Sequence, residues 1–286
     1  QRQIQRRQSG DWRSQGIGVA GLRVTLLRAP HRIVGGVDLA GYCVGLRGDV
    51  LEMTSNYGRF AGVRVLIFDL DGTLIDSKLD LAHSVNAMLE HMGREAHVHE
   101  TIFGFIGDGA AMLVRRALGE SVTEAEVERG LNYFLKYYRE HMLDNTVAYP
   151  GVREALAELA GDSARPGTDS ARVMAVLTNK PVVFSRAILD GLGLSRYFRF
   201  VYGGNSFERK KPDPMGVEVL LRDLQVSPQE ALLIGDSDVD IKTARNAGIF
   251  ACGVSYGFGL AGLRAHPPDL MVDSLMELLG HLNGDA

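Results

Sequence analysis

The sequence predicts an α/β protein: a parallel sheet with helices on both faces, and an all-helical segment inserted after the first strand. Three observations support this prediction. From Val63 onward, short apolar runs alternate with stretches of helical periodicity, as right-handed β-α-β crossovers require. The apolar runs are almost entirely hydrophobic, which is typical of strands buried on both faces. Residues 78–145 contain helical patterns without an intervening apolar run.

The first predicted strand, 63–68, is a short apolar run that ends in polar residues. Five later runs share this composition: 173–177, 200–202, 232–234, 250–254 and 270–272. Helical spacing predicts the crossover helices 152–159, 182–192, 215–224 and 241–247. Gly248 is a C-terminal stop signal for the last helix, and Ser227–Glu230 resembles a capping box with proline at the first helical position.

The inserted segment shows helical spacing twice, in Leu81, Val85, Met88 and Met92, and again in Val127, Leu131, Phe134 and Tyr138. We therefore expect a catalytic core made of residues 62–77 and 146–286, and a helical cap made of residues 78–145. Within the core, residues 161–170 are polar and are expected to form an exposed loop.

The first 61 residues are expected to be a poorly structured or spurious leader, with Met53 as the natural start of the functional chain. Residues 1–60 carry nine arginines and four acids, a balance of +5, whereas the rest of the chain has a balance of −9. The GxGxxG pattern at 16–21 follows polar sequence instead of a buried strand, so it does not indicate a dinucleotide site. A basic nucleic-acid arm and a targeting peptide are the alternatives, but the arginines are scattered and lack an amphipathic stripe.

The composition excludes several classes of protein. No apolar stretch approaches the roughly 18 residues that a membrane-spanning helix needs. Two cysteines, Cys43 and Cys252, cannot make a disulfide framework, which favours a reducing, cytoplasmic compartment. We expect a monomer or a homodimer that does not bind membranes or nucleic acid.

Polar residues that could take part in catalysis or binding follow four of the predicted strands. Ligands of parallel sheets bind at these strand ends. The residues are Asp69 and Asp71, Thr178 and Asn179, Lys211, and Asp236 and Asp240. Residues two apart in an extended chain point the same way, so both Asp69 and Asp71 are expected to face one pocket. With Asp236 they would bring three negative charges together, which is unfavourable unless a cation neutralises them or some of the groups are protonated. Oxygen ligands alone select a hard ion, and Mg²⁺ suits best. Lys211 and the Thr178 hydroxyl can hold phosphoryl oxygens.

This order of motifs resembles the haloacid dehalogenase superfamily of phosphotransferases, from about Val63 to the end of the chain. The resemblance implies a Rossmann-like core. It implies that Asp69 is a nucleophile that forms an aspartyl-phosphate, and that Asp71 is the general acid and base. It further implies that Thr178, Asn179 and Lys211 bind the phosphoryl group. Asp69, the Asp71 backbone carbonyl and Asp236 would bind Mg²⁺, with Asp240 supporting them.

Details within the superfamily favour a phosphatase. Dehalogenases and phosphonatases lack the second acid, Asp71, and sugar phosphomutases usually have Gly-Val where this chain has Gly72-Thr73. Segments 106–109, 113–118 and 253–259 resemble phosphoglycolate phosphatases, and Gly107 and Arg115 are candidates for substrate specificity. The predicted partner is thus a small phosphorylated metabolite, 2-phosphoglycolate. A nucleotidase, a pyrophosphatase, a sugar-phosphate phosphatase and a β-phosphoglucomutase-like mutase are the alternatives.

A phosphoacceptor that resembles a signalling receiver domain is an alternative of another class. The helical insertion and the acid two residues after Asp69 count against it. Lys210 is expected to be surface charge, and Arg115 and Arg116 are also explained as solvated helix positions. His91, His97 and His99 lack a ligand spacing and are expected in an exposed loop.

Overall fold

The computed structural model describes residues 42–47, 50–55, 59–161 and 172–283 and divides the chain into two compact units, Gln1–Tyr57 and Gly58–Ala286. The glycine pattern at 16–21 and the basic sequence before residue 42 lie outside the described residues. So do residues 162–170 of the predicted polar loop.

The first unit contains an antiparallel hairpin of β1 (Tyr42–Arg47) and β2 (Val50–Ser55), with Tyr42 opposite Ser55. Residues 1–61 were expected to be a poorly structured or spurious leader, so this hairpin was not predicted. Two short runs containing β-branched residues, separated by Gly48-Asp49, have the spacing of a hairpin, but they lack the strict alternation that would have revealed it.

The second unit is built on a six-stranded parallel sheet. Its strand order is β10 (Leu270–Val272), β9 (Phe250–Val254), β8 (Ala231–Gly235), β3 (Val65–Phe68), β6 (Val173–Leu177) and β7 (Phe200–Tyr202). All six predicted strands are confirmed. From β3 the chain proceeds to β6 and β7 on one side and then crosses to β8, β9 and β10 on the other. The strand order therefore reverses at β3, and open α/β sheets bind ligands at such a point.

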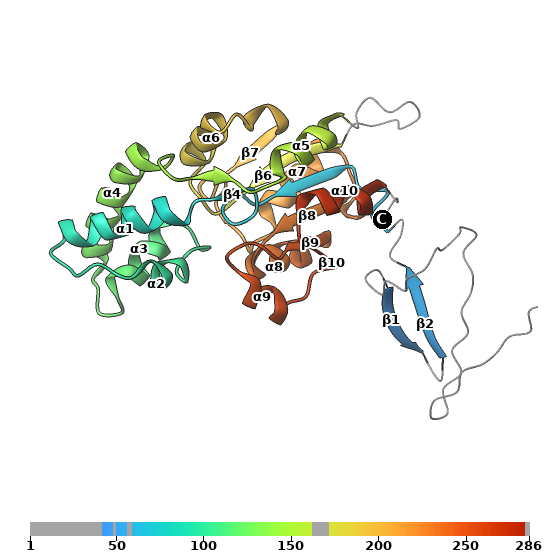
Figure 1. Cartoon of the computed structure of the whole chain (residues 1–286), viewed down its shortest axis with the longest axis horizontal. Helices are drawn as coiled ribbons and strands as arrows, with labels where there is room; N and C mark the ends of the chain where they lie inside the picture. The colour runs from blue at the N-terminus through green and yellow to red at the C-terminus, as the bar shows by residue number, and fades with distance from the viewer. Residues whose placement is uncertain (1–41, 48–49, 56–58, 162–171, 284–286) are drawn as a thin grey trace, which may run out of the picture. The chain divides into compact units, whose positions relative to one another are not determined.

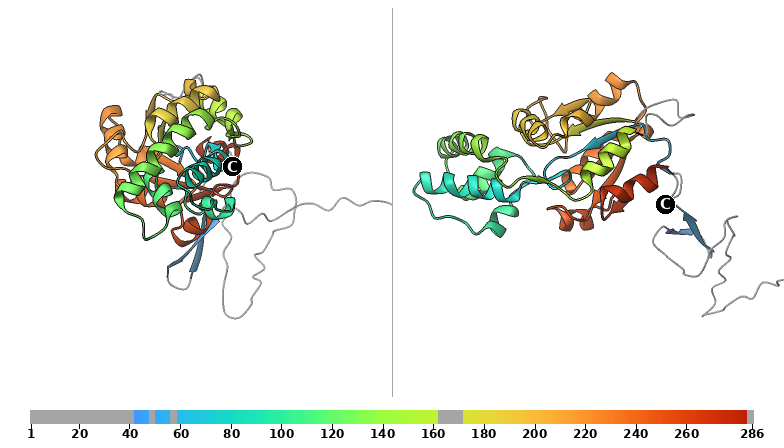
Figure 2. Two further views of the ribbon diagram at one scale, coloured as in Figure 1. Left: turned by 90° about the vertical axis from the view of Figure 1, so that its left-hand side faces the viewer. Right: turned by 45° about the horizontal axis from the view of Figure 1, so that its top comes forward.

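Alternate residues of β3 belong to two different cores. Leu66 and Phe68 pack with α5 (Val152–Gly161), α6 (Val182–Gly191) and α10 (Leu275–Asn283). Val65 and Ile67 pack with α7 (Met215–Leu224), α8 (Asp238–Ala247) and α9 (Leu260–Ala265). The sheet is thus covered by helices on both faces, as predicted (Figures 1 and 2). The predicted capping box at Ser227 begins a single 3-10 turn, Pro228–Glu230.

The core begins earlier than residue 62. Phe60 is fully buried, and its ring packs edge-on against Phe250 of β9 at 5.3 Å between centroids. The predicted boundary was wrong by a few residues because an isolated phenylalanine before a glycine carries no periodic signal.

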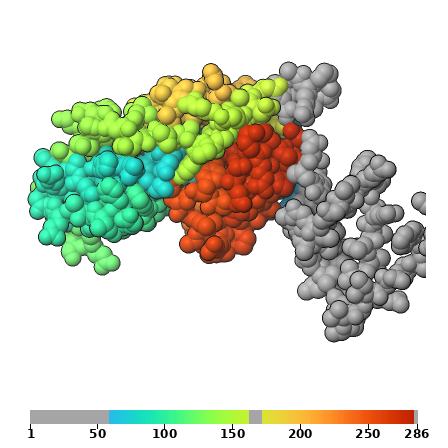
Figure 3. Space-filling view, in the orientation of Figure 1, coloured from blue at the N-terminus to red at the C-terminus, as the bar shows by residue number. Residues whose placement is uncertain are grey.

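The inserted segment is helical throughout its main elements: α1 (Lys78–His91), α2 (His99–Phe103), α3 (Ala110–Leu118) and α4 (Glu124–His141). Thr123 and Glu126 form a capping box that begins α4. The four helices group together beyond one end of the sheet (Figure 1), and their atoms adjoin those of the core in the space-filling view (Figure 3). We refer to them as the cap.

A short antiparallel pair joins the cap to the core. β4 (Ile75–Asp76) leads out of the core and β5 (Val147–Ala148) leads back. The buried carboxylate of Asp80, in the first turn of α1, accepts hydrogen bonds of 2.7–3.0 Å from the backbone and side chains of Asn145 and Thr146. Both crossings between core and cap are therefore tied to one another, a feature that the sequence analysis did not predict.

Candidate active site

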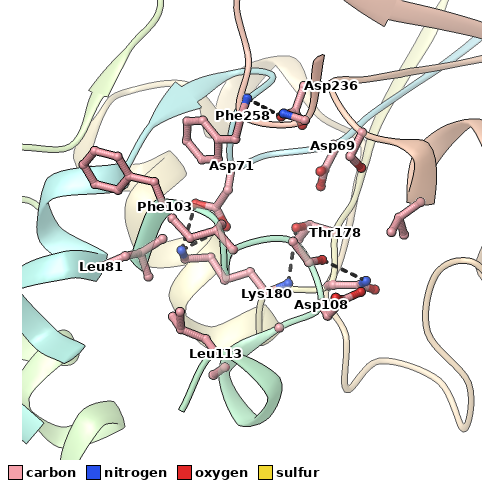
Figure 4. Close-up of a pocket in the computed structure, with 18 of the residues that line it drawn as sticks. Asp69, Asp71, Leu81, Phe103, Asp108, Leu113, Thr178, Lys180, Asp236 and Phe258 are labelled. Atoms are coloured by element: carbon pink, nitrogen blue, oxygen red, sulfur yellow. Dashed lines mark hydrogen bonds and ion pairs between the residues drawn. The ribbon is translucent and has the colours of Figure 1, made fainter. Parts of the chain in front are cut away.

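A cavity of about 230 Å³ lies between the ends of the strands and the cap. The core supplies its polar lining, including Asp69, Asp71, Thr178 and Asp236 (Figure 4). The cap supplies mainly apolar walls: Leu81, Phe103, Ile106, Leu113, Phe134 and Leu135. The predicted convergence of strand ends on one pocket is therefore observed.

Three carboxylates gather where β3 and β8 end. Ligand atoms of Asp69, Asp236 and Asp240 all lie within 4.8 Å of one another, and this is the one group of potential metal ligands among the described parts of the chain. Burial raises the pKa of Asp69 to about 6, although Lys211 opposes the shift. Burial, together with the charges of Asp240 and Asp69, raises the pKa of Asp236 to about 8.

Lys211 neutralises part of this charge. Its buried ammonium lies 2.9 Å from Asp69 Oδ1 and 2.6 Å from Asp240 Oδ1. Burial alone would lower the pKa of Lys211, but the two carboxylates outweigh it and raise the pKa. Asp240 Oδ2 accepts hydrogen bonds from the backbone and hydroxyl of Ser237, which begins α8. Three carboxylates and one ammonium leave a charge of −2, which one divalent cation would balance.

Backbone contacts orient Asp236. Its Oδ2 accepts hydrogen bonds from the backbone N–H of Phe258, at 2.7 Å, and of Gly259, at 3.2 Å. Gly72, with φ of +85°, passes so close that a Cβ there would collide with the Asp236 carboxylate. Glycine is therefore required at position 72, both by its backbone conformation and by this close approach.

Asp71 has a separate set of partners. Its Oδ1 accepts a 2.5 Å hydrogen bond from the Ser77 hydroxyl, and the Lys180 ammonium lies 2.9 and 3.0 Å from its two oxygens (Figure 4). The sequence analysis missed Lys180, although it comes only two residues after Thr178. Burial opposes the charge of Lys180, but the nearby Asp71 carboxylate outweighs it, so the pKa of Lys180 is raised.

The Lys180 ammonium also contacts the cap. It lies 4.7 Å from the ring centroid of Tyr138, a buried residue of α4 that lines the cavity. Burial raises the pKa of Tyr138 to about 12, so its hydroxyl stays protonated near neutral pH. That hydroxyl makes no hydrogen bond with any residue that the structure describes.

The side chain of Asn179 connects two loops by hydrogen bonds and does not offer a donor to phosphate. Its Nδ2 donates to the carbonyl of Gly107 in the cap, at 3.2 Å, and to that of Lys211, at 3.1 Å. Both amide hydrogens are therefore used, and its remaining Oδ1 is an acceptor that cannot bind a phosphate oxygen. The prediction that this side chain binds phosphate is not supported, whereas Thr178 is buried at the cavity as expected.

The loop before α3 closes over the core. Gly107, a candidate for substrate specificity, lines the cavity. Gly109, with φ of +85°, lies so close to the Asn179 carbonyl that a Cβ would be 2.9 Å from it. Lys210, expected to be mere surface charge, is exposed but donates a 2.6 Å hydrogen bond to the Asp108 carbonyl of this loop.

Arg115 does not reach the cavity. Its guanidinium pairs with Glu124 at 2.5 Å on the surface of the cap. On α3 the cavity is lined by Ala110 and Leu113, and a residue two positions after Leu113 points to the other side of the helix. The position of Arg115 in this structure therefore does not support its predicted role in specificity.

Each of the three cap histidines contacts a different residue. His97 Nε2 lies 2.9 Å from the Ala117 carbonyl, His91 stacks on Tyr133, and His99 packs against His83. The expectation of an exposed loop is wrong for two of them, because His91 is the last residue of α1 and His99 the first of α2.

The fold and the site together define an enzyme with a Rossmann-like core, a helical cap and a cluster of aspartates between them. Residues 66–254 match the family model of the haloacid dehalogenase-like hydrolases, and the chain belongs to this family. Within the described residues, no helix has the length and apolar character needed to cross a membrane.

Relatives in sequence and in structure agree with this assignment. A protein of Pseudomonas syringae pv. tomato named phosphoglycolate phosphatase is 39% identical over 79% of this chain and 84% of its own length. One of Chromobacterium violaceum with the same name is 38% identical over 76% of this chain and 95% of its own. The crystal structure of a predicted phosphoglycolate phosphatase from Haemophilus somnus superposes with a TM-score of 0.70 at 30% identity, covering 76% of this chain and 97% of its own.

Proposed function

We propose that this protein is a magnesium-dependent phosphatase that hydrolyses 2-phosphoglycolate through an aspartyl-phosphate on Asp69. The position of the Asp69 carboxylate carries the proposal: it lies at the cavity, beside the Lys211 ammonium and within a cluster of acids with a net charge of −2. The names of relatives that are 38–39% identical support the choice of substrate.

Mg²⁺ fits the donor set, because all the ligands are hard oxygens and the acid cluster needs two positive charges. Asp69, Asp236 and the backbone carbonyl of Asp71 would hold it. When bound, it would neutralise phosphoryl charge and so lower the repulsion between the phosphate and an anionic nucleophile.

In the first step, an Asp69 carboxylate oxygen attacks phosphorus and the bond between phosphorus and the ester oxygen breaks. Asp71 donates a proton to that leaving oxygen, so glycolate departs as a neutral alcohol at that position. Lys211 and the Thr178 hydroxyl hold the phosphoryl oxygens during the transfer.

In the second step, Asp71, now a carboxylate, removes a proton from a water molecule that attacks the phosphorus of the aspartyl-phosphate. The bond between phosphorus and Asp69 breaks, inorganic phosphate leaves, and both aspartates return to their starting protonation states. Ser77 and Lys180 hold the Asp71 side chain in place.

The size of the cavity supports a small ester. Its volume of about 230 Å³ is below the roughly 300–1,000 Å³ of pockets that take drug-sized ligands. A panel of 2-phosphoglycolate, nucleoside monophosphates, hexose phosphates and pyrophosphate therefore tests the substrate directly, and a preference for any of the other three would refute phosphoglycolate.

Replacing the nucleophile tests the mechanism. We expect Asp69→Asn to lower kcat by about 10³-fold or more, because the amide is a poor nucleophile. Asp223→Asn, the same change at an exposed position paired with Arg222, is the matched control. In the presence of an alcohol acceptor, the wild type should give the same ratio of phosphate to alkyl phosphate from every ester, since all esters share one phosphoenzyme. A ratio that varies with the leaving group would contradict the intermediate.

A further inference from the structure

The described lining of the cavity contains one cation, Lys180, among several carboxylates. A substrate with a carboxylate on its leaving group needs positive charge or hydrogen-bond donors there, because the other charged groups of the lining would repel it. Lys211, the other buried lysine, is already placed between Asp69 and Asp240.

The geometry puts Lys180 on the leaving-group side of the cavity. Its ammonium bonds to Asp71, the residue that protonates the leaving oxygen, and not to Asp69. An ammonium has three N–H donors, and the two oxygens of Asp71 account for two of them. The third donor lies beside Tyr138, whose ring centroid is 4.7 Å from the ammonium.

Tyr138 offers a second donor at the same place. Its side chain lines the cavity and is 2% exposed, and its hydroxyl has no hydrogen-bond partner among the described residues. A buried hydroxyl without a partner is unfavourable, and a ligand that supplies an acceptor removes this cost.

We propose that Lys180 and Tyr138 bind the carboxylate of the substrate's leaving group and thereby select esters with an anionic leaving group. The proposal rests on the proposed function, since it assigns the residues that recognise the glycolate end of 2-phosphoglycolate. Lys180 belongs to the core and Tyr138 to helix α4 of the cap. The carboxylate would therefore bridge core and cap, so that recognition of the substrate also holds the cap closed.

The test compares 2-phosphoglycolate with 2-hydroxyethyl phosphate, which has a hydroxymethyl group in place of the carboxylate. The measured quantity is the ratio of kcat/KM for the two esters. We expect Tyr138→Phe to lower this ratio about 10-fold, mainly through KM for phosphoglycolate, since it removes one hydrogen bond to a charged group. Lys180→Met should lower it more, roughly 100-fold, because it removes the charge as well.

Tyr137→Phe is the matched control. Tyr137 precedes Tyr138 on α4, stacks on His141 and is not part of the cavity lining, so the ratio should not change. Thermal unfolding of each variant establishes that it is folded, and Tyr138→Phe keeps the buried ring.

The outcomes distinguish a failure of the carboxylate site from a failure of the proposed substrate. If the wild type prefers phosphoglycolate but both variants keep its ratio, or lower kcat/KM equally for both esters, the carboxylate site is wrong and the phosphatase assignment stands. If the wild type hydrolyses both esters equally well, the proposed substrate itself is wrong, and the carboxylate site with it.

Discussion

Two buried lysines, Lys180 and Lys211, have different surroundings: Lys180 lines the cavity, whereas Lys211 is bonded to Asp69 and Asp240. Lys211 lies between Asp69 and Asp240 with Asp236 nearby, so its neighbourhood carries a charge of −2 when all three carboxylates are ionised. Lys180 pairs with Asp71 alone and contacts an aromatic ring, so its neighbourhood is neutral.

The difference indicates that the two lysines bind different parts of the substrate. Around Lys211, excess negative charge requires a metal ion, and the metal and lysine together can hold a phosphoryl group. Around Lys180, the charges already balance, which leaves donors free for a leaving group. Carboxylates keep both lysines charged against the cost of burial.

The largest expected effect comes from Lys211→Met. It leaves Asp240, which is fully buried, without its cation, and we expect the free energy of unfolding to fall by about 3–5 kcal/mol. We also expect kcat to fall by about 10³-fold. Chemical denaturation and phosphate release measure the two effects. Lys180→Met should destabilise less, because Asp71 is 14% exposed and keeps the Ser77 hydrogen bond.

Lys242→Met is the control for the Lys211 variant. Lys242 pairs with Asp238 at a half-buried position next to solvent, so its loss should change stability by no more than about 1 kcal/mol. Equal losses of unfolding free energy in the Lys211 and Lys180 variants would contradict the proposed difference between the two lysines.

An intermediate effect is expected from Mg²⁺, and it should depend on pH. Asp69 and Asp236 have pKa values of about 6 and about 8 in the metal-free fold, above their ordinary value of 3.8. A raised pKa stabilises the metal-free fold at low pH, and this contribution is lost as the pH rises through 6 and then 8. Mg²⁺ binds the ionised carboxylates, so the rise in Tm that it causes should be larger at pH 8 than at pH 6.

At a concentration of 100 times its Kd, the ion would add about 2.7 kcal/mol to stability. Asp236→Asn should remove the response to Mg²⁺ without destabilising the metal-free protein at pH 8, because it deletes a buried charge. A response to Mg²⁺ that is equal in this variant, or equal at both pH values, would rule out this site for the metal.

The smallest effect is expected from Lys210→Ala, which removes the hydrogen bond from the core to the Asp108 carbonyl of the cap loop. The contact is exposed, so we expect KM to rise only about 2–3-fold, with no change in Tm. Arg209→Ala, which removes an exposed pair with Asp213, is the control. A loss comparable to that of the Lys180 variant would mean that loop closure, more than charge, determines binding on the cap side.

The sequence predicted the part of the site that belongs to strand ends. Asp69, Thr178 and Asp236 each follow a short apolar run directly, and parallel strands bring their carboxyl ends to one edge of the sheet. These residues could be recognised because each one follows a predicted strand in the sequence, and this fixes its position at the edge of the sheet. The cap was recognisable for a similar reason, since its helices repeat apolar residues at a regular spacing.

Contacts between distant segments could not be predicted in this way. Lys180 meets Asp71 across 109 positions of sequence, and Tyr138 meets Lys180 only because α4 packs over the core. Arg115 looked like a cavity residue from its motif, but the rotation of α3 turns it toward Glu124. The sequence by itself determined the sheet, the cap and the acids at the strand ends, because these depend on local periodicity and adjacency. Only the tertiary structure decided which side chains face the cavity, because that depends on how the cap packs on the core.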